Sequence, residues 1–214
     1  MERVNFYVDG FNFYYGLKNM KNTDSNWQKY YWLDYVKFFQ NFMGANQVLQ
    51  NVIYFAAQPP HDVQRKQQNL FSANKLLNPE HFEIVMGQFY RKNITCKVCK
   101  STFTAYEEKR TDVNIALRLV SDCTIDNVDT LVLVSADSDL LPPLQFIKER
   151  HPQKNIRVYF PPSNFSVALN NFMKSCKKPI IRLERSKMKF ANSIMPDIVT
   201  KDGITYTIPP KWKA

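Results

Sequence analysis

Two aspartates, Asp137 and Asp139, follow directly after the apolar run at residues 130–134. A run of β-branched and apolar residues without a polar break predicts a strand that is buried on both faces, as in a parallel sheet. Open α/β sheets bind their ligands beyond the carboxyl ends of such strands. Asp139 could cap the helix that follows. A cap needs only one acid, however, so the second acid predicts a functional site.

Two further acids could meet this pair. Asp9 ends the predicted buried strand at residues 3–8 and precedes Gly10, which permits a tight turn. Asp112 lies in the first turn of a predicted helix over residues 111–123, on the apolar face of that helix. This position points Asp112 inward, although stabilisation of the helix dipole is a competing interpretation.

These acids and two neutral oxygen donors make one candidate site, which consists of Asp9, Asp112, Asp137, Asp139, Asn12 and Ser135. Clustered carboxylates repel one another unless their pKa values rise or a cation holds them together. Oxygen ligands without His or Cys suit Mg²⁺ or Mn²⁺. Such ions commonly act on phosphate substrates, where they stabilise the attacking and leaving oxygens. We therefore predict that the four aspartates bind metal and are catalytic.

Alternating strands and helices must position these acids. Predicted strands lie at residues 3–8, 51–57, 82–86, 130–134, 155–160 and 179–183. Predicted helices lie at residues 13–18, 32–43, 61–77, 111–123, 140–149 and 165–176. This alternation indicates an α/β sandwich with a mainly parallel sheet. With right-handed crossovers and the strand order 3-2-1-4-5, the first and fourth strands are neighbours at the switch point.

Length and composition exclude several classes of protein. The 214 residues suffice for one sizeable domain, and no apolar run approaches the roughly 20 residues of a membrane helix. The first ten residues read as a strand and a turn, not as a signal peptide. Four cysteines do not make a disulfide framework, so we expect a reduced, cytoplasmic setting. The absence of P-loop, G-x-G-x-x-G and G-x-S-x-G motifs argues against nucleotide-cofactor and serine-hydrolase chemistry.

The basic charge is concentrated in the last third of the chain. Residues 148–214 hold 14 Lys and Arg against 4 Asp and Glu, whereas residues 1–147 hold 15 of each kind. A basic face beside an acidic pocket suits a polyanion, so we favour a nucleic-acid partner over a merely solubilising surface. The candidate phosphate-binding side chains are Lys109, Arg110, Lys174, Lys177, Lys178 and Arg182. Tyr14 and Tyr15, near Asp9, could stack on bases, whereas core packing is the default for most other aromatic residues.

Residues 88–104 are predicted to form a hairpin insertion that holds Cys96 and Cys99. The spacing C-x₂-C is half of a structural zinc site, which needs four ligands. Only Cys123 and Cys176 remain, both in predicted helices that are distant in sequence. A zinc site could be completed across a homodimer, but a metal-free turn is the favoured interpretation. Cys123 and Cys176 are expected to be small core residues.

Three blocks of sequence carry a family resemblance. They are VDGFNFYYGL at residues 8–17, YEEKRTDVNIALRLVSD at residues 106–122 and LVSADSDLLPPL at residues 133–144. In this order they resemble the signature blocks of the NYN domain family, which are PIN-like proteins that include metal-dependent ribonucleases. The resemblance implies a three-layer α/β/α sandwich. We expect an NYN domain at residues 1–183 and a basic C-terminal extension or arm at residues 184–214.

The resemblance also implies a function. The acidic positions of the family correspond to Asp9, Asp112, Asp137 and Asp139, and a metal-activated water would hydrolyse RNA phosphodiester bonds there. Ala136 stands where relatives often have Gly or Asn, which alters the turn slightly. The alternative is a non-catalytic RNA-binding or regulatory NYN module that keeps the acidic pocket, because fold and acids do not settle activity. A phosphatase, or a nuclease that acts on DNA or small nucleotides, is a third interpretation.

Overall fold

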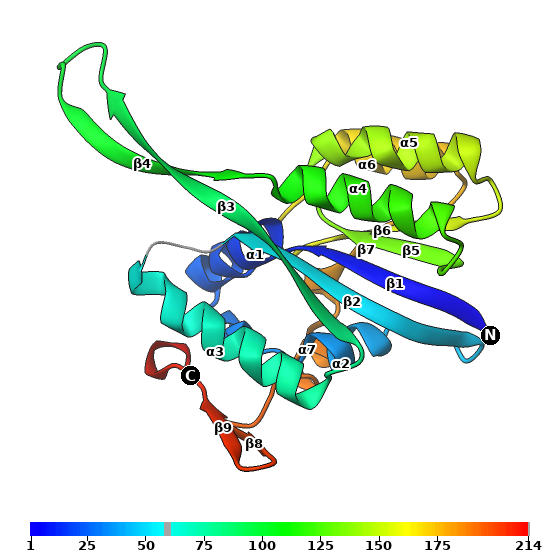
Figure 1. Cartoon of the computed structure of the whole chain (residues 1–214), viewed down its shortest axis with the longest axis horizontal. Helices are drawn as coiled ribbons and strands as arrows, with labels where there is room; N and C mark the ends of the chain where they lie inside the picture. Colours follow the sequence, from blue (N-terminus) through cyan, green and yellow to red (C-terminus); the bar gives the residue numbers. More distant parts are fainter. Residues whose placement is uncertain (58–60, 214) are drawn as a thin grey trace.

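A seven-stranded sheet forms the centre of the computed structural model, which describes residues 1–57 and 61–213. The strand order is β4-β3-β2-β1-β5-β6-β7 (Figure 1). The strands are β1 (Glu2–Asp9), β2 (Gln47–Ala57), β3 (Phe82–Thr95), β4 (Thr102–Lys109), β5 (Thr130–Val134), β6 (Asn155–Phe160) and β7 (Ile181–Arg182). All neighbouring strands are parallel except β3 and β4. The predicted α/β class, parallel sheet and order of the five main strands are confirmed.

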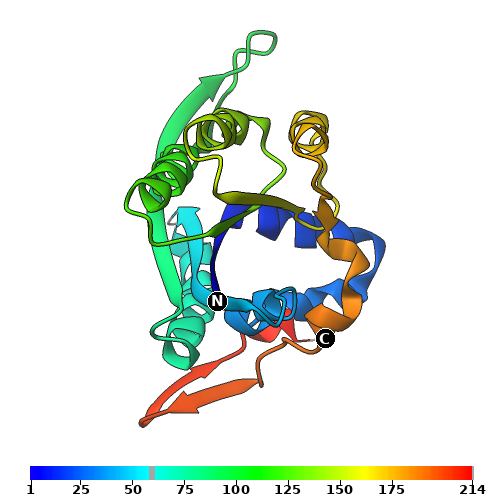
Figure 2. The same cartoon turned by 90° about the vertical axis from the view of Figure 1, so that its right-hand side faces the viewer.

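Helices cover both faces of the sheet and make three layers (Figure 2). The lower layer in Figure 1 contains α1 (Gly10–Thr23), α2 (Tyr35–Gln40) and α3 (His61–Leu77), and the upper layer contains α4 (Thr111–Thr124), α5 (Leu141–Arg150) and α6 (Val167–Ser175). Phe6 and Val8 of β1 pack into the lower core, whereas Tyr7 packs into the upper core. Burial on both faces explains the unbroken apolar run of β5, whereas β1 also buries the polar Asn5. Within the described residues, no helix is long and apolar enough to span a bilayer.

The turn from β1 into α1 depends on close packing at Gly10. A Cβ atom at this position would lie 2.3 Å from Cε1 of Tyr54 and 2.4 Å from the carbonyl oxygen of Phe55. Any larger residue would therefore push the start of α1 away from β2. Glycine allows the helix to begin directly after Asp9, which fixes the position of the first helical turn relative to the end of the strand.

The predicted helix over residues 32–43 is too long. Asp34 accepts a hydrogen bond from the backbone N–H of Lys37 and caps α2, which therefore begins at Tyr35. A 3₁₀ segment, η1 (Ser25–Tyr31), precedes this cap and buries Trp27. The apolar spacing indicated the buried face correctly but did not reveal the cap.

β3 and β4 form a long hairpin that projects from the body of the protein (Figure 1). Its pairs run from Gln88 and Lys109 at the base to Thr95 and Thr102 near the tip. The insertion predicted at residues 88–104 is indeed a hairpin, but its second strand continues to Lys109. This extension places the end of β4 directly before α4, at the carboxyl edge of the sheet.

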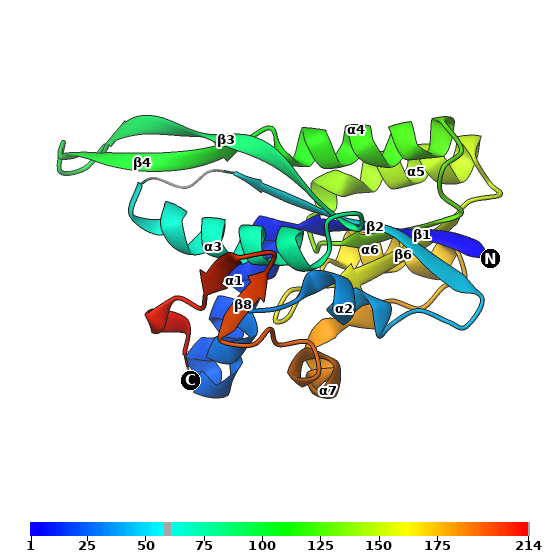
Figure 3. The same cartoon turned by 60° about the horizontal axis from the view of Figure 1, so that its bottom comes forward.

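The segment after residue 183 packs onto the lower core (Figure 3). It contains the 3₁₀ segment η3 (Leu183–Arg185), α7 (Lys187–Ala191), β8 (Ile198–Lys201), β9 (Ile204–Thr207) and the 3₁₀ segment η4 (Pro210–Trp212). Phe190, Val199 and Ile208 are buried in the lower core, and the β8–β9 hairpin contacts α3. These residues therefore contribute to the same core as α1 and α2, while the domain boundary at residue 183 stays a prediction.

Candidate functional site

The candidate site is centred on Asp9, at the carboxyl end of β1. Asp9 is only 2% exposed. Its Oδ1 accepts a hydrogen bond from the backbone N–H of Asn12 at 2.9 Å, and its Oδ2 accepts one from Nδ2 of Asn12 at 2.9 Å. Oγ of Ser135 donates a third hydrogen bond to Oδ2 at 2.7 Å. These bonds hold the carboxylate in one orientation.

Ser135 connects Asp9 to the two acids that follow β5. β1 and β5 pair as far as Val8 and Val134, so the two strands end side by side. Oγ of Ser135 accepts a hydrogen bond from the backbone N–H of Asp137 at 3.0 Å. Oδ1 of Asp137 in turn accepts one from the backbone N–H of Asp139 at 2.9 Å. One hydrogen-bonded chain therefore runs from Asp9 to the turn that carries Asp139.

Asp137 is the residue that caps the next helical element. Its side chain caps the 3₁₀ segment η2 (Ser138–Leu140), and α5 follows directly. The interpretation of Asp139 as the cap is thus wrong, because Asp139 lies within the first turn of η2. The cap is made through Oδ1 of Asp137, so Oδ2 of the same carboxylate stays available to a cation.

The carboxylates at this edge influence one another. Burial raises the pKa of Asp9 to about 6, and the charges of Asp112 and Asp137 act in the same direction. The prediction that Asp112 points inward is wrong, because this residue is exposed at the start of α4. Its carboxyl is still partly desolvated, which raises its pKa, and the charges of Asp137 and Asp139 act in the same direction. Acids from β1, α4 and the β5 turn therefore share one electrostatic environment, in which a bound proton or cation relieves the repulsion.

Glu108 is a fifth acid at this edge, and it is absent from the set of acids predicted from sequence. Its Oε1 accepts a hydrogen bond from Oγ1 of Thr111 at 2.5 Å. Burial raises the pKa of Glu108, and the charges of Asp9 and Asp112 act in the same direction. The acidic pair in YEEKRTD could have indicated this residue, but the same polar stretch is equally typical of a solvated turn.

The donor set fits a hard divalent cation. The aspartates offer carboxylate oxygens, and neither His nor Cys is among them, which suits Mg²⁺ or Mn²⁺. Among the side chains that the structure describes, no three from His, Cys, Asp or Glu are grouped as a metal site. The acids thus share one edge and one electrostatic field, but they do not form a ready-made coordination shell.

Three of the predicted phosphate-binding residues lie on the carboxyl-edge side of the fold. Arg182 is level with the last residue of β6 and forms an ion pair with Glu184 at 2.6 Å. Lys109 ends β4 and pairs with Glu107 at 2.7 Å. Arg110 donates a hydrogen bond to the hydroxyl of Tyr90 at 3.1 Å. Each of these cations already has a partner on the protein.

The other three candidates, Lys174, Lys177 and Lys178, do not gather around the acids. They lie at the C-terminal end of α6, a helix that starts beyond the carboxyl end of β6 and runs back along the sheet. Nζ of Lys148, near the end of α5, donates to Oγ of Ser175 at 3.1 Å, so the last turns of both helices lie together. This basic group is therefore at the opposite end of the upper layer from Asp9.

The cysteines are not assembled into a zinc site. Cys96 and Cys99 lie near the tip of the β3–β4 hairpin, where a hydrogen bond with Ser101 lowers the pKa of the Cys99 thiol to about 7. Cys123 is 2% exposed within the upper core, and Cys176 is partly buried against it. Among the described residues, no third metal-binding side chain joins the hairpin cysteines.

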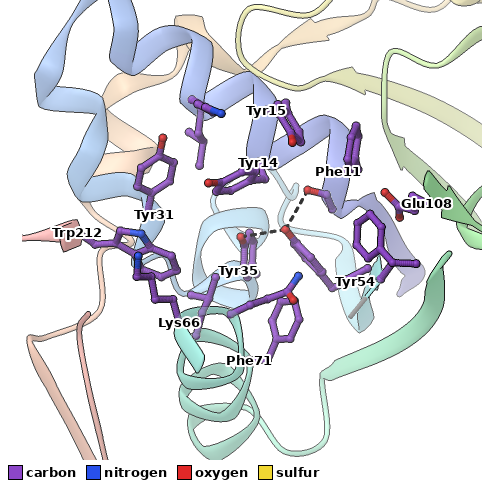
Figure 4. A pocket seen from close by; sticks show the side chains of 18 residues that line it. Phe11, Tyr14, Tyr15, Tyr31, Tyr35, Tyr54, Lys66, Phe71, Glu108 and Trp212 are labelled. Carbon is purple, nitrogen blue, oxygen red and sulfur yellow. Dashed lines mark hydrogen bonds between the residues drawn. The ribbon is translucent and has the colours of Figure 1, made fainter. Parts of the chain in front are cut away.

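An aromatic pocket of about 510 Å³ lies beside the acids (Figure 4). Its rings come from α1, η1, α2, β2, α3, β3 and η4, and they are Phe11, Tyr14, Tyr15, Tyr31, Tyr35, Tyr54, Phe71, Phe89 and Trp212. The charged residues of its lining are Lys18, Lys66 and Glu108. Of these residues, only Tyr14 and Tyr15 are predicted from sequence as base-stacking candidates, because they lie close to Asp9 along the chain.

Comparison with known proteins places this arrangement in a family. Residues 3–180 match the sequence profile of the NYN domain. A similar protein is 6-hydroxy-3-succinoylpyridine 3-monooxygenase HspA of Pseudomonas putida, which is 27% identical over 202 residues. The match covers 78% of this chain and 62% of that protein, so the chain spans less than two thirds of the relative's length.

Proposed function

The chain belongs to the NYN domain family, and from this premise we propose that it is a metal-dependent ribonuclease that hydrolyses RNA phosphodiester bonds. The observation that carries the proposal is the hydrogen-bonded chain from Asp9 through Ser135 to Asp137, with Asp112 in the same electrostatic environment. Acids gathered at the carboxyl edge of a parallel sheet occupy the position where such sheets bind ligands.

Each residue of the site would have a definite role. Asp9, Asp112, Asp137 and Asp139 would hold Mg²⁺ or Mn²⁺, which when bound supplies charge stabilisation and lowers the pKa of water. Ser135 and Asn12 orient the Asp9 carboxylate through their hydrogen bonds. Because burial raises the pKa of Asp9 to about 6, this carboxylate is available to a cation only after it has lost its proton.

The test is cleavage of labelled single-stranded and hairpin RNA in Mg²⁺, Mn²⁺ or EDTA. Asp112→Asn and Asp137→Asn should abolish cleavage and leave the fold intact. Asp202→Asn is the matched control, because Asp202 is exposed in the β8–β9 turn and adopts a left-handed conformation that Asn tolerates. Full activity of either site variant would refute this mechanism.

RNA binding without turnover would instead support the non-catalytic RNA-binding module. The lack of three closely grouped metal-binding side chains in the described residues favours this second candidate. Such a module should bind RNA with an affinity that falls steeply with salt, and it should show no cleavage with any divalent ion.

The aromatic pocket favours one more candidate, a site for a small aromatic molecule. The relative's name gives 6-hydroxy-3-succinoylpyridine as a substrate of that protein, and the pocket here combines aromatic rings with Lys18 and Lys66. A thermal shift with that pyridine, lost in Lys66→Met, would support this candidate. An unchanged melting temperature at saturating pyridine would refute it.

A further inference from the structure

The aromatic pocket presents unusually exposed rings along α1. Phe11 is 44% exposed, Tyr14 is 38% exposed and Tyr15 is 40% exposed. The Phe11 and Tyr15 centroids lie 4.4 Å apart, and the ring of Tyr14 lies at 30° to that of Tyr31, 5.6 Å away. These rings pack against one another on one side and leave their other surfaces open. Such surfaces bind flat aromatic groups by stacking.

The inner wall of the pocket is neutral. Tyr35 donates a hydrogen bond to the hydroxyl of Tyr54 at 3.4 Å, and Tyr54 donates to the carbonyl oxygen of Gly10 at 3.3 Å. Burial raises the pKa of both phenols, so they stay protonated. The hydroxyl pair therefore adds polar atoms without charge, which suits the edge of an uncharged heterocycle.

The charged residues of the pocket favour an anion near its mouth. Of the side chains that the structure describes, two cations, Lys18 and Lys66, and one acid, Glu108, line it. Nζ of Lys18 lies 5.2 Å from the centroid of Tyr15, so a positive charge lies next to one of the exposed rings. Adjacent aromatic and cationic groups are the combination that binds a base and its phosphate.

The pocket also adjoins the acids. Gly10 and Phe11 line it and directly follow Asp9 in the sequence. Glu108 lines it too, and burial together with the charges of Asp9 and Glu108 raises the pKa of Tyr54 in its wall. The volume of about 510 Å³ falls in the range of roughly 300–1,000 Å³ that is usual for small-ligand sites. A group of nucleotide size held here would have its phosphate near the carboxyl edge of the sheet.

We infer that the aromatic pocket is a subsite for one unpaired base of the RNA substrate, and that base stacking on Phe11 and Tyr14 positions the neighbouring phosphodiester at the acids. The inference rests on the proposed function, because it names the part of RNA that this site recognises. It requires a single-stranded nucleotide, since a base within a duplex is not available for insertion.

Binding should be measured by fluorescence anisotropy with a labelled single-stranded RNA of about twelve nucleotides, in an Asp137→Asn background with Mg²⁺. Tyr14→Ala should weaken this binding by about 5- to 150-fold, which corresponds to the loss of one stacked base. Tyr14→Phe keeps the ring and should bind as tightly as the background protein. Phe146→Ala removes an exposed ring on α5, outside the pocket lining, and should also leave binding unchanged.

Two further measurements separate stacking from a loss of structure. Phe11→Ala removes a second, more exposed ring and should weaken binding in the same way, with thermal melting as the check that each variant is folded. The same RNA with abasic positions throughout, or fully paired in a duplex, should bind the background protein as weakly as Tyr14→Ala binds the intact strand. Equal affinity for intact and abasic RNA would overturn the inference.

The inference and the proposed function fail in different ways. If both ring variants weaken binding but the wild type cleaves no RNA, the base subsite stands and the ribonuclease proposal falls. If the wild type cleaves RNA and both folded ring variants bind normally, the base subsite is refuted and the ribonuclease proposal stands. The base subsite would also be refuted if free 6-hydroxy-3-succinoylpyridine raised the melting temperature of the protein while the ring variants left RNA binding unchanged.

Discussion

Replacement of Asp9 by asparagine should stabilise the metal-free protein at neutral pH. Burial raises the pKa of Asp9 from 3.8 to about 6, so the folded protein holds the proton more tightly than the unfolded chain. When the pKa of a group differs by one between the folded and unfolded states, the free energy of unfolding changes by about 1.36 kcal/mol. The charged carboxylate therefore lowers the free energy of unfolding of the wild type by about 3 kcal/mol at pH 7.5.

The sign of this effect distinguishes Asp9 from most carboxylates. Its destabilisation is absent well below pH 3.8, where both states are protonated, grows as the pH rises from about 3.8 to about 6, and is complete well above pH 6. Asn is neutral throughout. Its one side-chain oxygen can accept the bonds from Nδ2 of Asn12 and Oγ of Ser135, whereas its NH2 group replaces the oxygen that accepts from the backbone N–H of Asn12. The loss of that bond does not change with pH. The stability difference between Asp9→Asn and the wild type should therefore increase by about 2.4 kcal/mol between pH 4 and pH 7.5.

Urea unfolding in EDTA, followed by tryptophan fluorescence across this pH range, measures the difference directly. Asp129→Asn is the control with the opposite slope. Arg3 donates hydrogen bonds to Asp129 from its backbone N–H, Nε and guanidinium and lowers the pKa of that carboxyl. Asp129→Asn should therefore be destabilising at pH 7.5 and progressively less so in acid. A pH-independent difference for Asp9→Asn, or a slope of the same sign as the control, would refute the reasoning.

Two other predictions concern the carboxylates. Asp122→Ala should lower the free energy of unfolding by about 3–5 kcal/mol, because Asn5, Tyr7 and Arg118 all donate to that buried carboxylate and would lose their partner. Urea unfolding should show a far smaller effect for Glu149→Ala at the exposed end of α5, and equal losses would contradict the prediction. Saturating Mg²⁺ should raise the melting temperature more at pH 7.5 than at pH 5, because Asp9 must lose its proton to bind the ion. Calorimetry on Asp9→Asn provides the test, and an unchanged Mg²⁺ effect in that variant would exclude Asp9 as a ligand.

The strands of the sheet could be predicted from sequence because each one can be recognised in a short stretch of neighbouring residues. β5 is buried along its whole length and reads as an apolar run, and the carboxyl-terminal halves of β1 and β2 are buried and mostly apolar. Right-handed crossovers then left few ways to order the strands, and the order placed Asp9 beside the turn after β5. The four aspartates of this edge were accessible to sequence reasoning because each of them ends, follows or opens a regular element.

The roles of Glu108, of the pocket rings and of Lys154 could not be predicted from sequence, because they depend on contacts that only the folded structure shows. Glu108 belongs to the site because β4 continues to Lys109, whereas a polar stretch such as YEEK resembles a loop. Tyr31 and Trp212 meet with ring centroids 5.7 Å apart despite their separation in sequence. Lys154 counted as surface charge, yet it is 8% exposed and donates to the carbonyl oxygen of Val128 at 2.6 Å. In each case the side chain's partner, and not its type, determines its role.

The position of β1 in the middle of the sheet affects when the site can form during synthesis. β1 is synthesised well before its partner β5, and the Ser135–Asp9 hydrogen bond closes a separation of 126 residues. Long-range pairing of this kind is slow to form. Trp212 adds the last ring of the aromatic pocket later still. A nascent chain can therefore join the acidic edge only after β5 and its turn have been synthesised, and it can complete the pocket only after Trp212 has been added.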